Sequence, residues 1–209
     1  MYKIRDSLIE QEIKKSKSEK KFSIILLVVV VVFFLVALLN TYVFGTVIVD
    51  GPSMENTLYT GDVLKVNKLK SPDRGDIIVI AGENSSAWII KRVIGLPGDT
   101  VKIREGYVYL IKANSTQEIL LQEDYVKEQG KTYCPANPSM GEIELAKQER
   151  VFEVGENEIF YLGDNRMNSS DSRKETYLCC NFNQIVGVVE DWALQARGII
   201  KFFNFLSFN

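Results

Sequence analysis

Three short stretches of the sequence carry residue types that can perform acyl-transfer chemistry. Ser53 lies in a Gly-Pro turn context (GPSMENTL), Lys91 interrupts an apolar run (WIIKRVIG), and Ser169 lies in a polar loop (GDNRMNSSDSR). The chain contains no histidine, which excludes a Ser-His-Asp triad and histidine metal ligands. A serine nucleophile in this chain therefore needs another base, and Lys91 is the candidate.

Lys91 can act as a base only if its pKa lies far below the value of about 10.4 that lysine has in solution. The residues around it are apolar: Trp88, Ile89, Ile90, Val93 and Ile94. Burial among them disfavours the ammonium form, and Arg92, on the other face of the strand, adds like-charge repulsion. We expect the neutral amine to accept the proton of Ser53, and Ser169 to hold the amine through a hydrogen bond.

Each of these stretches has an ordinary interpretation when it is taken alone. Ser53 would be a turn residue, Lys91 a strand residue that faces solvent, and the loop around Ser169 an array of Asx turns or surface ion pairs. Their order along one chain, after an apolar segment, favours the catalytic interpretation.

The apolar segment covers residues 22–39 and contains no charged residue. As a helix with roughly 1.5 Å rise per residue it is long enough to cross a bilayer once. A removable signal sequence is the alternative, but no small-x-small cleavage site follows the run. Five lysines crowd its N-terminal flank: Lys14, Lys15, Lys17, Lys20 and Lys21. The positive-inside rule then predicts a cytoplasmic N-terminus and an extracytoplasmic body.

The body alternates short apolar runs with turn signals, which predicts an all-β extracytoplasmic catalytic domain with coiled antiparallel sheets in a barrel-like arrangement. We expect five parts: a cytoplasmic segment at 1–21, a transmembrane helix at 22–42, a catalytic β core at 43–104 and 151–197, an inserted subdomain at 105–150, and an apolar C-terminal tail at 198–209. The tail is too short to span a membrane. It is either a final strand or an interfacial patch that touches lipid.

Composition limits the possible partners and cofactors. The net charge is −2 and no basic stripe is present, so no nucleic-acid partner is expected. The three cysteines are Cys134, Cys179 and Cys180. A disulfide from Cys134 to one of the adjacent pair and three reduced thiols are both open. Three thiols without histidine give no familiar ligand spacing, so we expect no metal and no other cofactor.

The motifs in this order resemble those of bacterial type I signal peptidases, membrane-anchored serine proteases that use a Ser/Lys dyad to remove signal peptides from exported proteins. The resemblance rests on Ser53-Met54, the strand RGDIIVI, the motifs KRVIGLPGD and GDNRMNSSDSR, and IVGVV near the end. It implies that Ser53 is the acylating nucleophile and Lys91 the general base.

The resemblance also implies supporting roles. Ser169 would orient the lysine amine, Asp171 and Arg173 would form an ion-pair network with Arg92, and Met54 would line the substrate groove. Gly163, Asp164 and Asn165 would shape the loop behind the dyad.

The chain departs from the family pattern at two positions. The family usually has proline where this chain has Asn56, and some members have a hydroxyl residue at the position of Gly51 that helps to form the oxyanion hole. The backbone N–H of Ser53 then remains as a donor, and the main chain at Gly51 is a second candidate.

The expected function is cleavage of exported preproteins at small-x-small sites, in the plasma membrane beside the lipid bilayer and the protein translocation machinery. A self-cleaving Ser/Lys peptidase, as among stress-response repressors, is disfavoured by the membrane anchor and the missing DNA-binding domain. A non-catalytic peptidase-like assembly factor for a dedicated surface-export or pilus system is the alternative from another class. The presence of both Ser53 and Lys91 disfavours it.

Overall fold

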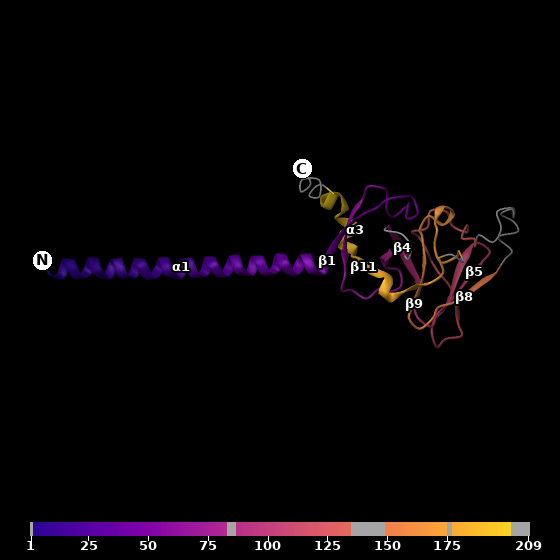
Figure 1. Ribbon diagram of the computed structural model, residues 1–209, viewed down its shortest axis with the longest axis horizontal. Coiled ribbons are helices and arrows are strands. Elements are labelled where there is room, and N and C mark those ends of the chain that lie inside the picture. The colour runs from indigo at the N-terminus through magenta and orange to yellow at the C-terminus, as the bar shows by residue number, and fades with distance from the viewer. Residues whose placement is uncertain (1, 83–86, 135–148, 175–176, 202–209) are drawn as a thin grey trace. The chain divides into compact units, whose positions relative to one another are not determined.

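The computed structural model describes residues 2–82, 87–134, 149–174 and 177–201. The chain divides into two compact units, residues 1–43 and 44–209, which are described separately (Figure 1).

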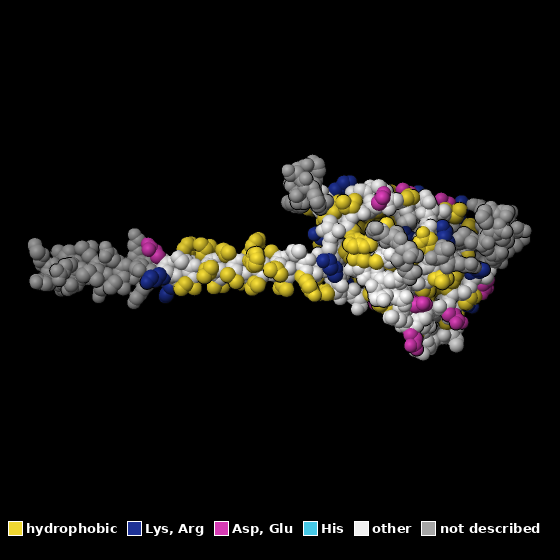
Figure 2. Space-filling model, in the orientation of Figure 1, with side chains coloured by type: hydrophobic (Ala, Val, Ile, Leu, Met, Phe, Trp, Pro, Cys, Tyr) yellow, Lys and Arg dark blue, Asp and Glu magenta, His cyan; other side chains and the backbone are white. Residues whose placement is uncertain are grey.

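The first unit is the single helix α1, Tyr2–Val43. Its part Glu19–Val43 is the one helix in the described chain that is long and apolar enough to cross a membrane, with a mean hydropathy of 3.5 over the best window. Figure 2 shows apolar side chains on every visible side of this part, and none of the window is buried. A helix that is apolar all around suits a lipid surrounding. The helix runs without a break through the boundary expected at residue 21.

The second unit contains two antiparallel sheets (Figure 1). The larger has seven strands in the order β1 Phe44–Ile48, β2 Val63–Asn67, β11 Ile185–Val189, β3 Ile77–Ala81, β4 Trp88–Gly95, β9 Glu158–Leu162 and β10 Cys180–Asn181. The smaller has four, in the order β7 Glu118–Leu120, β6 Tyr107–Ile111, β5 Thr100–Arg104 and β8 Arg150–Glu153. The remaining elements are the 3-10 turns η1 Arg166–Asn168 and η2 Phe182–Gln184 and the helix α3 Asp191–Gln195.

The predicted combination of antiparallel sheets with one N-terminal apolar helix is confirmed. The barrel-like arrangement is not a closed barrel, because β1 and β10 end the larger sheet as edge strands and do not pair with each other in the described chain. The smaller sheet joins β5 to β6, so the boundary expected between residues 104 and 105 falls between two paired strands. Residues 198–201 of the expected tail are helical rather than a strand, and 202–209 lie outside the described residues.

Strand β4 contacts all three apolar clusters of the core. Ile90 packs against the cluster that contains Leu58 and Leu64. Ile94 belongs to the cluster under the smaller sheet, and Val93 belongs to the third. A side chain at position 91 is therefore carried on a strand that has little freedom to move.

Candidate active site

Ser53 and Lys91 lie in hydrogen-bond contact. Ser53 belongs to the turn between β1 and β2, and Lys91 lies in the middle of β4. The Nζ atom of Lys91 is 2.8 Å from the Oγ atom of Ser53 and donates a second hydrogen bond to the carbonyl oxygen of Ile90, at 2.9 Å. Both residues line a cavity of about 590 Å³. The contact places an amine where it can take the proton of the hydroxyl.

Burial controls the protonation of the lysine. Lys91 is only 4% exposed, and this desolvation lowers its pKa to about 8. The negative charges of Asp171 and Asp164 oppose the shift, and the positive charge of Arg173 adds to it. The expected cause, burial, is therefore dominant. The cation that contributes is Arg173 and not Arg92.

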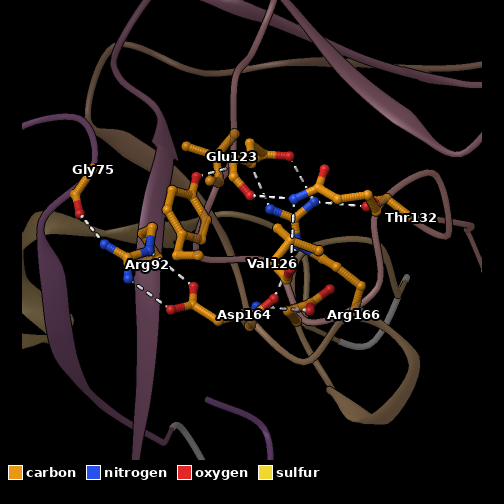
Figure 3. A network of polar contacts seen from close by, with 12 residues as sticks. Gly75, Arg92, Glu123, Val126, Thr132, Asp164 and Arg166 are labelled. Atoms are coloured by element: carbon orange, nitrogen blue, oxygen red, sulfur yellow. Dashed lines mark hydrogen bonds and ion pairs between the residues drawn. The ribbon is translucent and has the colours of Figure 1, made fainter. Parts of the chain in front are cut away.

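Arg92 makes a different ion pair from the one expected. Its Nε and Nη2 atoms bind the carboxylate of the fully buried Asp164 at 2.9 and 2.6 Å, and its Nη1 atom donates to the carbonyl of Gly75 at 2.7 Å (Figure 3). The hydroxyl of Thr57 donates to the same carboxylate of Asp164. Arg92 thus ties β4 to the loop after β9 and does not contact Asp171.

Asp171 and Arg173 form a second, separate ion pair. The Nε and Nη2 atoms of Arg173 lie 2.7 and 2.9 Å from the two carboxylate oxygens, and the backbone N–H of Gly163 donates to Asp171 at 3.1 Å. Burial acts to raise the pKa of Asp171, but the guanidinium of Arg173 outweighs it and the pKa is lowered. The expected single network is therefore two ion pairs that hold different parts of one loop.

Ser169 lies in the cavity wall, but it does not bind Lys91. Its Oγ atom is buried and makes no hydrogen bond of good geometry among the described residues, although it lies close enough to Asp171 to help lower the pKa of that carboxyl group. A side chain at Gly163 would collide with Ser169 and with the carbonyl of Ser53. Glycine at position 163 is therefore what lets the loop approach Ser53. The orienting role of Ser169 stays a prediction.

Met54 and Gly51 also line the cavity. Met54 is almost completely buried and packs in the core cluster that contains Leu58 and Leu64. The N–H of Gly51 donates to the Thr60 hydroxyl at 3.1 Å, so it is already engaged. The N–H of Ser53 has no hydrogen-bond partner in the described part of the chain, which leaves it free to bind an oxyanion.

Asn165 holds the peptide groups on both sides of Ser53, a role that its place in the motif did not reveal. Its backbone N–H donates to the carbonyl of Ser53 at 3.0 Å, and its side-chain amide donates to the carbonyl of Pro52 at 3.0 Å. The Pro52 carbonyl and the Ser53 N–H share one trans peptide plane and point in opposite directions. Asn165 therefore fixes the direction of the Ser53 N–H.

Residues from the expected insertion reach the site, which the sequence did not predict. Tyr133 and Cys134 line the cavity, and Glu123 forms an ion pair with Arg166. In the sequence, Glu123 is only one carboxylate within a polar segment, and such a pattern is too common to predict a role at the site.

The three cysteines are free thiols in the structure. Burial raises the pKa of Cys134 to about 11 and those of Cys179 and Cys180 to about 12. The thiols therefore stay protonated at neutral pH, and protonated thiols are poor nucleophiles. Among the described residues, no group of three or more carboxylates and thiols is placed to hold a metal ion.

Comparisons with known proteins agree on one family. The family described as signal peptidase, peptidase S26, matches residues 21–194. Signal peptidase I P of Bacillus subtilis subsp. natto is 37% identical over 160 residues, which cover 75% of this chain and 80% of the relative. Signal peptidase I T of Bacillus subtilis (strain 168) is 34% identical over 157 residues, which cover 73% and 75%.

A crystal structure of a signal peptidase I from Enterococcus faecalis V583 is also similar, with 30% identity and a TM-score of 0.42 over 58% of this chain and 98% of that one. The family match spans most of the chain and includes both Ser53 and Lys91. The chain therefore belongs to the signal peptidase family, peptidase S26.

Proposed function

We propose that the protein is a membrane-bound serine endopeptidase that removes signal peptides from exported preproteins, with Ser53 as nucleophile and Lys91 as general base. The observation that carries this proposal is the 2.8 Å contact between the Nζ atom of Lys91 and the Oγ atom of Ser53, made by a buried lysine. A surface lysine with a pKa of about 10.4 is almost entirely protonated at neutral pH, whereas Lys91, with its pKa near 8, has a neutral fraction of roughly a tenth at pH 7 and is mostly neutral above pH 8.

In the proposed reaction the Oγ atom of Ser53 attacks the carbonyl carbon of the scissile bond while Lys91 takes the hydroxyl proton. The N–H of Ser53 stabilises the oxyanion of the tetrahedral intermediate. Lys91 then gives its proton to the departing amine and the C–N bond breaks, which leaves an ester on Ser53. Water, deprotonated by Lys91, hydrolyses the ester and restores the hydroxyl.

The substrate is proposed to bind as an extended strand in the cavity. Strand β1 pairs only with β2 in the described chain, so its other edge is open, and its last residue, Ile48, and the following Val49 line the cavity. On the opposite wall, Trp88–Lys91 of β4 have no register partner in β9, which pairs only from Arg92 onward. Open strand edges bind an extended peptide through its main chain. The small-x-small rule would follow from side chains that alternate into shallow pockets.

The helix Glu19–Val43 supports a single-pass anchor in the plasma membrane. The lysines on its N-terminal flank favour a cytoplasmic N-terminus and an extracytoplasmic catalytic domain. An anchor would keep the active site beside the bilayer, where the apolar segment of a preprotein is embedded and the translocation machinery delivers it.

Cleavage of a purified preprotein by the full chain in detergent tests the proposal. We expect Ser53→Ala and Lys91→Met to fold and to lose cleavage, and the control Lys102→Met, on the smaller sheet, to retain it. Normal cleavage by either dyad variant would refute the assignment. No cleavage by the wild type would favour a non-catalytic role.

A further inference from the structure

One segment, Glu123–Lys127, contacts two parts of the active site that are far apart in the sequence. One is the nucleophile turn, residues 53–58, and the other is the loop at residues 163–173. The segment belongs to the expected insertion, and none of its residues lines the catalytic cavity. Its contacts therefore concern how the site is held together rather than the reacting atoms.

Toward the loop, the segment makes a buried bidentate ion pair. The Nη1 and Nη2 atoms of Arg166 lie 2.9 and 2.6 Å from the two carboxylate oxygens of Glu123, and the side chains are only 1% and 7% exposed (Figure 3). Arg166 also donates from Nη1 to the Thr132 hydroxyl at 2.7 Å and from Nε to the carbonyl of Gly163 at 3.0 Å. Glu123 thus fixes a guanidinium that in turn fixes the start of the loop.

The ion pair extends to the second half of the same loop. The carbonyl oxygen of Arg166 accepts a hydrogen bond of 2.7 Å from the Nη2 atom of Arg173, the residue that pairs with Asp171. The position of Arg166 therefore affects the group of charges that surrounds Lys91. Glu123 is the only carboxylate that the structure pairs with Arg166 among the described residues.

Toward the nucleophile turn, the segment makes contacts that are more exposed. The side-chain amide of Asn56 donates to the carbonyl of Tyr125 at 3.1 Å, and Lys127 pairs with Glu55 at 3.0 Å. The Tyr125 ring lies under the guanidinium of Arg92 at 3.9 Å, and its hydroxyl donates to Glu123 at 2.8 Å. One short segment thus spans both arms of the site.

A buried ion pair often contributes no more to the stability of a core than apolar side chains of the same volume would. Its geometric advantage is that a carboxylate and a guanidinium fix each other in one orientation. We propose that Glu123 is a positioning residue, which acts through Arg166 to hold the loop at 163–173 against the nucleophile turn and so keeps Ser53 and Lys91 in contact. This inference rests on the proposed function.

The test compares Glu123→Gln with the control Glu128→Gln in the full chain. The control makes the same chemical change in the same insertion, at a surface ion pair with Lys131 in which both side chains are 43% exposed. Steady-state cleavage is measured well below the unfolding midpoint of each variant. We expect kcat of Glu123→Gln to fall by about tenfold or more with KM changed by less than about twofold, because misplaced reacting groups slow the chemical step. The control should keep wild-type values.

A merely structural role would lower the unfolding midpoint of Glu123→Gln and leave kcat unchanged in the folded protein. That result, or an equal loss of kcat in Glu128→Gln, would overturn the proposal. If Glu123→Gln does not fold, Glu123→Asp carries the same test. It keeps the buried charge beside Arg166 but shortens the side chain, so the two-point contact with the guanidinium is lost. A fall of kcat by roughly threefold or more is expected, and wild-type kcat would overturn the proposal.

Amide hydrogen exchange separates a failure of this inference from a failure of the proposed function. In Glu123→Gln we expect faster exchange at residues 53–58 and 163–168 but not in β3 or β5. This measurement needs no substrate, so it remains decisive even if the wild type cleaves no preprotein. Unchanged exchange in both stretches would overturn the positioning role.

Discussion

The Nζ atom of Lys91 lies 2.8 Å from the Oγ atom of Ser53, and burial lowers the pKa of this lysine to about 8. The two groups come from elements with different constraints. Lys91 is carried by β4, which is packed on all three core clusters. Ser53 is carried by a turn that Asn165 holds through hydrogen bonds to the carbonyls of Pro52 and Ser53. The next residues of this turn, Glu55 and Asn56, bind Lys127 and Tyr125.

The first prediction concerns the pH dependence of cleavage. Below about pH 8 Lys91 is mostly protonated, and the protonated amine cannot accept the proton of Ser53, so kcat/KM should rise as the pH passes through 8 and then level off. The measurement is kcat/KM from pH 6 to 10 with a fixed preprotein. A profile that stays flat over this range would contradict a lysine base.

The second prediction concerns stability. The pKa of Lys91 is lower in the folded protein than the value of about 10.4 in the unfolded chain. The unfolded state therefore binds more protons between about pH 8 and 10.4, and stability rises with pH over this window. The buried lysine costs on the order of 3 kcal/mol below pH 8, a cost that fades as the pH approaches 10.4.

Lys91→Met removes this cost, so we expect the variant to unfold at a higher temperature than the wild type at pH 7, with the difference shrinking toward pH 10. Thermal unfolding of both proteins in the same detergent, at both pH values, checks this. Lys102→Met is the control, because Lys102 is a partly exposed lysine in surface ion pairs. A lower midpoint for Lys91→Met at pH 7 would show that desolvation does not dominate at this site.

The pairing of Ser53 with Lys91 could be predicted from the sequence because both signals are local. A lysine within an apolar run and a serine in a Gly-Pro turn, in a chain without histidine, leave few other ways to build a nucleophile. The strands were predictable for the same reason, since alternation is a property of neighbouring residues. Which edges meet is not local, and for that reason the open ends of the larger sheet at β1 and β10 were not predicted.

The partners of the arginines were not predictable either. Arg92 was expected to join Asp171, but it binds Asp164, 72 residues away in sequence. Arg166 binds Glu123, 43 residues away. The sequence offers each arginine several carboxylates as possible partners. Only the folded position of the loop determines which carboxylate each arginine binds. The same holds for Asn165, whose side chain reaches the carbonyl of Pro52 across 113 residues.

The third prediction concerns Asn165. Asn165→Ala removes the side-chain bond to Pro52 and frees the peptide plane that directs the Ser53 N–H. Because loss of an oxyanion donor costs about a hundredfold or more in kcat, we expect loss of its alignment to cost about tenfold, measured as single-turnover acylation. The pH at which kcat/KM levels off should not move, since Asn165 does not contact Lys91.

Asn157→Ala is the matched control for this prediction. Asn157 is an exposed turn residue next to β9. Its backbone carbonyl accepts a hydrogen bond from the N–H of Phe182 at 3.3 Å, and it does not line the cavity. It should acylate at the wild-type rate. An Asn165→Ala protein that acylates as fast as the wild type would show that the Ser53 N–H is directed by other contacts.

The last prediction concerns Asn56, where the family usually has proline. The N–H of Thr57 donates to the carbonyl of Met54 at 3.1 Å, so Asn56 is the third residue of a tight turn, and its φ is +89°. Asparagine and glycine tolerate this conformation, but proline is fixed near a φ of about −65°. The turn after Ser53 therefore has a backbone that proline cannot adopt.

Asn56→Pro should accordingly lower the stability by about 2 kcal/mol or more and reduce cleavage, whereas Asn56→Gly should fold as stably as the wild type. Thermal unfolding and turnover of the two variants, measured side by side, check this. Glycine separates the backbone effect from the loss of the side-chain bond to Tyr125, because it lacks that bond and keeps the conformation. An Asn56→Pro protein with wild-type stability and turnover would mean that the turn adopts a negative φ at this residue in solution.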